Sequence, residues 1–427
     1  MNLEIRSLAL AALALGGSAA VALLPGCAVS QKPADWALVR EITPHALDSL
    51  AAVDPAVAAD DHGGVAVTWV TRGANGRDAW LAVSRDSGVT FSAPQRLNPR
   101  AGSVSSYPEG RPAAAFGPAG ALAMIWAERR PDTSGAVDVV VRASGDGGAT
   151  LGAPAYVNDD RTRGRPAYHG FPAIAFRADG SLFATWLDER DGKPSGGEPL
   201  ASSLYAARSL DGGQTWSANV RLVDSVCSCC RPAIVTDGAS GVAIAYRAAK
   251  GNLRDPALAV SLDGGATVAL DTVVSADRWY LEGCPDVGAG VTWNRGAGGT
   301  YAWFTGAQQP GVYLIPWHSG HGPAGVRRAL ADSLAGATHP RLAALGASTL
   351  IGVEARPRAD TTRTVFAVRV LDPDGRLTPW TFLGADAGEG WLVGVDARSA
   401  VACWTENEGE RHRVRVVRLE RRLASPR

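Results

Sequence analysis

Lysine and aromatic residues are scarce in this chain, and its net charge is zero. Only Lys32, Lys193 and Lys250 are lysines among 42 basic residues, which 42 acidic residues balance, and 7% of the chain is aromatic. A balanced charge gives no general attraction to nucleic acid or anionic lipid. The chain also lacks a glycine-rich nucleotide loop, a serine nucleophile elbow and a His-Glu-x-x-His helix. Its 50 glycines instead suit short strands joined by tight turns.

The N-terminal segment has the pattern of an export signal. The apolar stretch from Leu8 to Leu24 is too short and too rich in glycine and alanine for a stable membrane span. Its ending, Leu24-Pro25-Gly26-Cys27, resembles the lipoprotein box of bacterial exported proteins. That resemblance implies a lipid on Cys27 and, since Ala28 replaces the inner-membrane retention aspartate, an extracytoplasmic protein anchored at the outer membrane. Plain signal cleavage is the alternative. We therefore divide the chain into a signal peptide (1–26), a short tether (27–35) and one domain (36–427).

One phrase, Ser-x-Asp-x-Gly-x-Thr, recurs four times along the domain. Its aspartates are Asp86, Asp146, Asp211 and Asp263, and successive copies are 52 to 65 residues apart. Each copy lies between two β-type runs, so one supersecondary unit is repeated. On such a turn a short carboxylate can accept backbone N–H groups, and glycine permits positive φ. We predict that these aspartates are structural.

The repeated unit has the pattern of a propeller blade. Each unit opens with a short apolar segment that contains proline, continues with a stronger apolar run, and ends with two further strands. Four strands per unit, the innermost short, predict an all-β protein built as a β-propeller. Residues 391–419 supply three strands of a seventh blade, and Trp36 to Ile42 would supply the fourth, closing the ring without open sheet edges. Six blades is the alternative.

Core residues also recur with the unit. Tryptophans appear once per blade on the second strand, at Trp69, Trp126, Trp186, Trp303 and Trp404. This spacing favours packing between blades over a sugar-stacking surface. Cys403, in the middle of a strand, is predicted to be a buried core thiol.

The repeat resembles the Asp-box, or BNR, repeat of sialidases and related propellers, over residues 36–420. In that family the boxes lie on the face opposite the binding site, so the resemblance implies that the four aspartates are not catalytic. A Cys-x-Cys-Cys segment at 227–230, followed one blade later by Cys284-Pro285, resembles a subset of sialidase-like bacterial proteins. This second resemblance implies no particular reaction.

Loops that lead into the innermost strands of a propeller gather around the mouth of its central channel. The residues just before the blade-opening prolines should therefore lie near one another: Asp54, Arg111, His169, Arg231, Cys284 and His339. This set contains an acid, two arginines, two histidines and a cysteine, and a ring with a purely structural role would not require so many reactive and charged side chains. We expect the mouth to bind a small ligand, a glycan, a protein partner or a metal ion.

The cysteines form the densest cluster near this mouth. Cys227, Cys229 and Cys230 lie within four residues, and Cys284 occupies the equivalent loop of the next blade. In an oxidising compartment, Cys229 or Cys230 is expected to form a disulfide with Cys284.

Two of these four thiols would then remain. They are candidates for a soft-metal site, for copper or zinc, with His339 or His169 as a nitrogen ligand. The Cys-x-Cys-Cys spacing differs from the paired spacing of established zinc motifs.

The resemblance to sialidases implies an alternative function, an exo-glycosidase acting on sialic-acid-like sugars. Sialidases hold the substrate carboxylate with three arginines and use a Tyr–Glu pair as nucleophile and an aspartate as acid and base. The matching candidates here are Arg111, Arg231, Arg341, Tyr280, Glu282 and Asp188. No tyrosine follows Tyr313, although the family places its tyrosine in the late blades. Ligand binding without hydrolysis is therefore the leading prediction.

Overall fold

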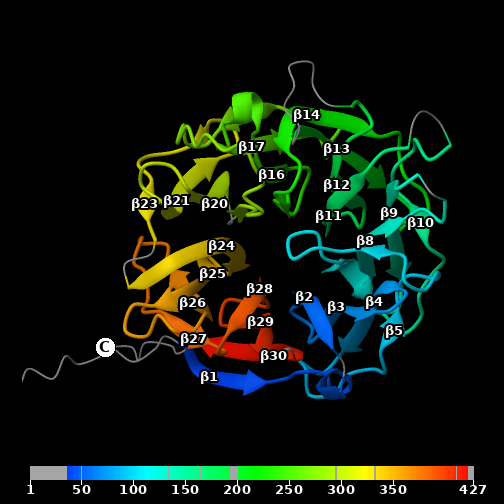
Figure 1. Ribbon diagram of the computed structural model, residues 1–427, viewed down its shortest axis with the longest axis horizontal. Coiled ribbons are helices and arrows are strands. Elements are labelled where there is room, and N and C mark those ends of the chain that lie inside the picture. Colours follow the sequence, from blue (N-terminus) through cyan, green and yellow to red (C-terminus); the bar gives the residue numbers. More distant parts are fainter. Residues whose placement is uncertain are drawn as a thin grey trace, which may run out of the picture. The chain divides into compact units, whose positions relative to one another are not determined.

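The computed structural model describes residues 36–49, 51–132, 134–162, 166–192, 201–293, 296–330, 333–409 and 411–421. The predicted signal peptide, tether and lipidation site at Cys27 lie outside these residues. Seven antiparallel sheets follow one another around a ring (Figure 1). No helix within these ranges is long and apolar enough to cross a membrane.

The strands of the first four blades follow the chain from the innermost strand outward. Blade 1 contains β2 (Ala52–Ala59), β3 (Val65–Gly73), β4 (Gly76–Ser84) and β5 (Gln95–Arg96). Blade 2 contains β6 (Val104–Ser105), β7 (Ala113–Phe116), β8 (Leu122–Arg129), β9 (Val137–Ser144) and β10 (Ala155–Tyr156). Blade 3 contains β11 (His169–Phe176), β12 (Leu182–Asp188), β13 (Ala201–Ser209) and β14 (Val220–Cys227). Blade 4 contains β15 (Ala233–Thr236), β16 (Val242–Arg247), β17 (Pro256–Ser261) and β18 (Leu270–Val273).

Three more blades complete the ring. Blade 5 contains β19 (Gly290–Val291), β20 (Gly298–Thr305), β21 (Gly311–His318), β22 (Gly322–Pro323) and β23 (Arg328–Ala329). Blade 6 contains β24 (Leu334–Leu345), β25 (Ser348–Pro357), β26 (Val365–Leu371) and β27 (Thr381–Leu383). Blade 7 contains β28 (Ala387–Gly394), β29 (Ser399–Glu408), β30 (Arg411–Arg421) and β1 (Trp36–Glu41). Short 3₁₀ turns occur at His45–Ser49, Pro118–Gly120 and Lys250–Asn252.

The two ends of the propeller domain meet in blade 7. Strand β1 pairs antiparallel with β30, with Val39 opposite Leu419 and Glu41 opposite Val417 (Figure 1). This pairing confirms the predicted closure and the seven-blade count. It supplies the last blade with its outermost strand, so the first and last parts of the domain hold each other in the ring.

The hydrophobic cores lie between neighbouring blades. Trp69 of blade 1 packs with Val401 and Cys403 of blade 7, and Trp126 of blade 2 packs with Leu81 of blade 1. Trp186, Trp303 and Trp404 are buried in the same way against the preceding blade. The recurrent tryptophans therefore join blades, and Cys403 is a fully buried core thiol.

The Ser-x-Asp-x-Gly-x-Thr segments form four nearly identical turns after the third strands. In the turn of blade 2, Asp146 Oδ1 accepts the Ser144 hydroxyl and the Thr150 N–H, while Oδ2 accepts the Thr150 hydroxyl. The same bonds recur at Asp86, Asp211 and Asp263. These bonds keep the pKa of each carboxyl below its usual range.

Strand register places these turns at one end of the ring and the candidate site at the other. Ser84, where the first turn begins, pairs with Val65 at the start of β3. Ala52, beside Asp54, pairs with Thr71 near the end of β3. We call the end that carries Asp54 the channel mouth.

Candidate functional site

The innermost strands of four blades share a break in register at the channel mouth. The breaks lie at Val53 to Ala56 in β2, Gly170 to Ala173 in β11, Thr338 to Arg341 in β24 and Gly388 to Trp391 in β28. Each break contains a residue with positive φ: Asp54, Phe171, His339 and Glu389. Residues other than glycine rarely adopt this conformation, and such bulges redirect side chains beside functional sites.

In blade 2 the innermost strand is divided into two short strands. Strands β6 and β7 both pair with β8, but residues 106–112 between them leave the sheet. This segment, which we call the mouth loop, contains Glu109 and Arg111, and both side chains are buried. Proline at 108 and at 112 removes two backbone donors, which suits a segment without sheet partners.

Three arginines from alternate blades converge on one tryptophan. The guanidinium carbons of Arg111, Arg231 and Arg341 lie 5.2, 4.7 and 5.2 Å from the centre of a Trp391 ring, within the range of cation–π attraction. These four residues line a cavity of about 140 Å³, together with residues of the innermost strands. The predicted arginine set thus comes together, at the centre of the ring.

Glu109 supplies a carboxylate to this arginine cluster. Its Oε1 accepts a hydrogen bond from Arg341 Nη2, and its Oε2 lies 3.7 Å from Arg231 Nε and accepts the Gly288 N–H at 3.0 Å. Burial alone raises the pKa of Glu109, but Arg341 and Arg231 outweigh it and hold the pKa well below its usual range. Glu109 is therefore a fully buried carboxylate ion.

Some donors of the cluster nevertheless remain without a partner. Burial and the neighbouring arginines lower the pKa of Arg231 to about 9. Among the described residues, the buried atoms Arg231 Nε and Arg341 Nη1 have no hydrogen-bond acceptor. One internal carboxylate therefore does not satisfy all the donors that converge on Trp391.

Arg111 is held mainly by carbonyl groups. It donates to the carbonyl oxygens of Pro108, Pro55 and Glu389 at 2.6 to 2.7 Å. The Glu389 carboxylate accepts the Asp54 N–H at 2.9 Å and the Thr405 hydroxyl. Burial and the charge of Glu389 raise the pKa of the Asp54 carboxyl. Asp54 and Arg111 thus belong to the same mouth cluster.

His339 lies at the edge of this cluster. Its Nε2 lies 3.1 Å from the Asp286 carbonyl oxygen, and its Nδ1 lies 3.5 Å from Glu354. Asp54, Arg111, Arg231 and His339 thus all lie at the channel mouth.

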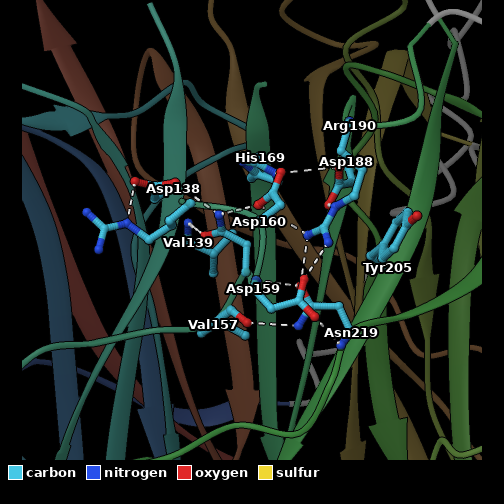
Figure 2. A network of polar contacts seen from close by, with 12 residues as sticks. Asp138, Val139, Val157, Asp159, Asp160, His169, Asp188, Arg190, Tyr205 and Asn219 are labelled. Carbon is cyan, nitrogen blue, oxygen red and sulfur yellow. Dashed lines mark hydrogen bonds and ion pairs between the residues drawn. The ribbon is translucent and has the colours of Figure 1, made fainter. Parts of the chain in front are cut away.

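His169 is placed elsewhere, in a polar network between blades 2 and 3 (Figure 2). Its Nε2 lies 3.1 Å from Asp160 and 3.5 Å from Asp188, and its Nδ1 lies 2.6 Å from the Val137 carbonyl oxygen. Burial lowers the pKa of His169, but the two aspartates outweigh it and raise the pKa above its usual value. Since both ring nitrogens are occupied, His169 is not available to the mouth or to the cysteines.

Asp188, the candidate acid and base of a glycosidase, belongs to that network. It accepts hydrogen bonds from Trp186 Nε1 at 2.7 Å and Arg190 Nε at 2.9 Å. Arg190 continues the network to Asp159 and Asn219 (Figure 2). These contacts give Asp188 a role in holding blade 3 and do not bring it to the three arginines.

Tyr280 and Glu282 contact each other but lie apart from the arginine cluster. The Tyr280 hydroxyl donates to Glu282, and the ring is 58% exposed. Within the described residues, no contact joins this pair to Arg111, Arg231 or Arg341. The structure therefore brings together the three candidate arginines of a sialidase-like site, but the candidate Tyr–Glu pair does not contact them.

The cysteine cluster lies two to five residues before Pro232, next to the arginine site in sequence. Cys229 forms a disulfide with Cys284, one of the two predicted pairings. Cys227 and Cys230 are free and buried, and Cys227 Sγ lies 3.5 Å from Cys229 Sγ. The hydrogen bond with Cys230 lowers the pKa of Cys227, while burial raises the pKa of Cys230.

A larger cavity, of about 590 Å³, lies at the opposite end of the ring. It is formed between the turns of blades 2 and 3, and Ser144, Thr150 and Asp211 line it. The Asp211 oxygens are already occupied by Ser209 and Thr215. The mouth cavity is smaller, but it alone of the two contains converging charged side chains with unpaired donors.

The sequence interpretation missed Glu109, Glu389 and Trp391. Glu109 lies two residues before Arg111, and Trp391 follows a blade opening that has Glu389-Gly390 where other blades have a proline. Aligning the seventh blade on the others would have pointed to Glu389. Nothing local indicated that Glu109 would meet Arg341, 232 residues later.

Among the solved structures similar to this chain, a polysaccharide lyase supports the fold. The polysaccharide lyase Uly1 has a TM-score of 0.55 and 13% identity, with 92% of this chain and 93% of the lyase covered. A protein of unknown function from Dyadobacter fermentans has a TM-score of 0.49 and 17% identity, covering 91% and 99%. Trypanosoma rangeli sialidase has a TM-score of 0.44 and 12% identity, covering 86% of this chain and 54% of the sialidase. No family model and no curated protein matches the sequence. The likeness to Uly1, at 13% identity, concerns the fold alone.

Proposed function

We propose that this protein is a binding propeller whose channel mouth holds the anionic group of a ligand, and that the ligand is an acidic sugar. The convergence of Arg111, Arg231 and Arg341 on Trp391 carries this proposal. Arginine is the preferred partner of carboxylates because its planar fork matches their geometry. The unpaired donors of Arg231 and Arg341 supply hydrogen bonds for a guest carboxylate.

Glu109 would compete with such a guest. It already occupies donors of Arg341 and Gly288, so a ligand carboxylate must displace it or use the remaining N–H groups. Displacement requires only the Glu109 side chain to move, because Arg111 in the same loop is held separately by the carbonyl oxygens of Pro55 and Glu389. The ligand would then gain charge-assisted bonds in a site with little water.

Calorimetric titration with N-acetylneuraminic acid and with glucuronic acid tests this proposal, and neutral N-acetylglucosamine is the control sugar. We expect the acidic sugars to bind and Arg231→Gln to weaken binding at least about tenfold, a loss typical of a buried charged hydrogen bond. Arg363→Gln is the matched control, since Arg363 is 44% exposed and pairs with Asp360 at the surface. Failure of the folded protein to bind either acid would refute the proposal.

A glycosidase acting on sialic-acid-like sugars is the second candidate function, because the same three arginines would hold the sugar carboxylate. Turnover of a fluorogenic sialoside that is lost in both Arg111→Gln and Tyr280→Phe would support it. Sugar binding without turnover would instead leave the protein as a binder. The separation of Tyr280 from the arginines favours the binding function.

We also propose that the chain is exported and lipid-anchored through Cys27, facing the periplasm or the cell surface. The support is the apolar segment 8–24 and the Leu-Pro-Gly-Cys ending. Expression in a bacterial host should give a protein that partitions into the detergent phase. Cys27→Ser should move it to the aqueous phase, and an unchanged partition would contradict lipidation.

A further inference from the structure

Four sulfur atoms gather where the chain enters blades 4 and 5. The Sγ atoms of Cys227, Cys229 and Cys230 all lie within 4.8 Å of one another, and all three residues are buried. Cys284 Sγ is bonded to Cys229 Sγ, so it belongs to the same group. Two pieces of chain 55 residues apart in sequence therefore supply one compact set of thiol ligands.

Two buried arginines lie beside these sulfurs without an ion-pair partner in the described residues. Arg247 donates to the carbonyl oxygens of Arg254, Val287 and Phe304. Arg254 donates to Ala249 and Asn252 oxygens, and its Nε has no acceptor although the residue is fully buried. The segment that carries both arginines packs on the sulfurs, because Tyr246 and Ala249 belong to the same buried cluster as Cys227, Cys229 and Cys230. A buried cation without an ion-pair contact is costly, so these two arginines favour an anionic centre beside them.

We propose that reduction of the Cys229–Cys284 disulfide converts this cluster into a thiolate site for one thiophilic d¹⁰ cation, Cu(I) or Zn²⁺. A dithiol reductant supplies the two electrons and becomes a disulfide itself. The S–S bond breaks, its two sulfurs become thiols, and the cation displaces their protons to solvent on binding. This site does not involve the arginines of the sugar proposal, so either proposal can fail alone.

The geometry and the charge both fit such an ion. A tetrahedral metal with metal–sulfur bonds of about 2.3 Å places its sulfurs about 3.8 Å apart, and Cys227 and Cys229 Sγ are already 3.5 Å apart. Zn²⁺ with four thiolates, or Cu(I) with three, carries a net charge of about −2. Arg247 and Arg254 would balance that charge.

The test loads the full chain with metal before and after reduction. The protein is reduced with dithiothreitol, desalted without oxygen and given Cu(I) or Zn²⁺ in separate samples. Metal retained through gel filtration is measured by mass spectrometry. The double variant Cys227→Ser/Cys230→Ser removes two ligands. Cys403→Ser is the matched control, because Cys403 is a buried free thiol in another blade.

We expect one ion per chain after reduction, little before it, loss in the double variant and retention in Cys403→Ser. The ion that is retained against a competing chelator identifies the preferred metal. In case the double variant does not fold, alkylation of the native wild-type protein provides a second readout, in which bound metal should protect Cys227 and Cys230. Reduced, folded protein that retains neither ion would overturn the proposal. Equal retention before reduction, or retention by the folded double variant, would also overturn it.

Discussion

Replacing Glu109 with glutamine tests the electrostatics of the channel mouth most directly. Glu109→Gln keeps the size of the side chain and removes its charge, leaving Arg231 and Arg341 buried without their carboxylate. Removing one partner of a buried ion pair typically costs about 3–5 kcal/mol, mainly because the other charge stays buried and unpaired. We expect a loss of stability in this range.

That free energy can be converted into a melting temperature. Unfolding entropy near 60 °C is about 2.1 cal/mol/K per residue, so for a domain of about 390 residues each 1 kcal/mol lowers the midpoint by about 1.2 °C. The expected decrease for Glu109→Gln is therefore about 4–6 °C. Calorimetry or circular dichroism can measure it, with Glu282→Gln as an exposed carboxylate control that should leave the midpoint unchanged.

Anion rescue separates electrostatics from a general packing defect. If the arginines in Glu109→Gln lack a counter-ion, acetate should bind there and raise the melting midpoint. At an acetate concentration 100 times its dissociation constant, the gain in the free energy of unfolding is about 2.7 kcal/mol. Sodium chloride at equal ionic strength is the control. A variant as stable as the wild type, or one that acetate does not stabilise more than chloride does, would refute the view that Glu109 neutralises a buried arginine cluster.

Two further predictions concern parts of the molecule outside the mouth. The raised pKa of His169 means that its charge contributes stability that is fully present below about pH 6.5, the unfolded value, and is lost as the pH rises through the folded pKa. The difference in urea midpoint between the wild type and His169→Gln should therefore shrink from pH 5.5 to pH 9, and a difference independent of pH would contradict the charged state of His169. Asp211→Ala removes the acceptor of the Ser209 and Thr215 bonds and should lower the melting midpoint by less than Glu109→Gln does. It should leave acidic-sugar binding unchanged, and altered binding would place a ligand at the opposite end of the ring.

Repetition made the framework of this protein predictable. The turn around Asp146 uses contacts within seven residues, so the same local sequence forms the same turn in four blades. The tryptophans recur at one place in the unit because every blade packs against its neighbour in the same way. The pairing of Trp36 to Ile42 with the last blade followed from counting strands.

The content of the site was predictable only in part. The residues before the prolines, such as Asp54 and Arg231, were expected at the mouth because all blades enter the ring there. Chain position could not show that His169 would instead bond Asp160 and Val137, since that choice depends on partners between blades. The disulfide from Cys284 could equally have gone to Cys229 or Cys230, which are adjacent in sequence.

The repeat and the end of the ring that carries the blade-entry residues could be predicted from the chain alone, because both depend on local periodicity, whereas seven blades were only favoured over six. Which charged side chains contact one another depends on the folded ring. Glu109 pairs with Arg341 and Arg231 from two other blades, and the segment that carries Arg247 packs against the cysteine cluster. Such contacts arise from ring closure and from loops that leave their sheets, and neither a blade nor its sequence alone encodes them.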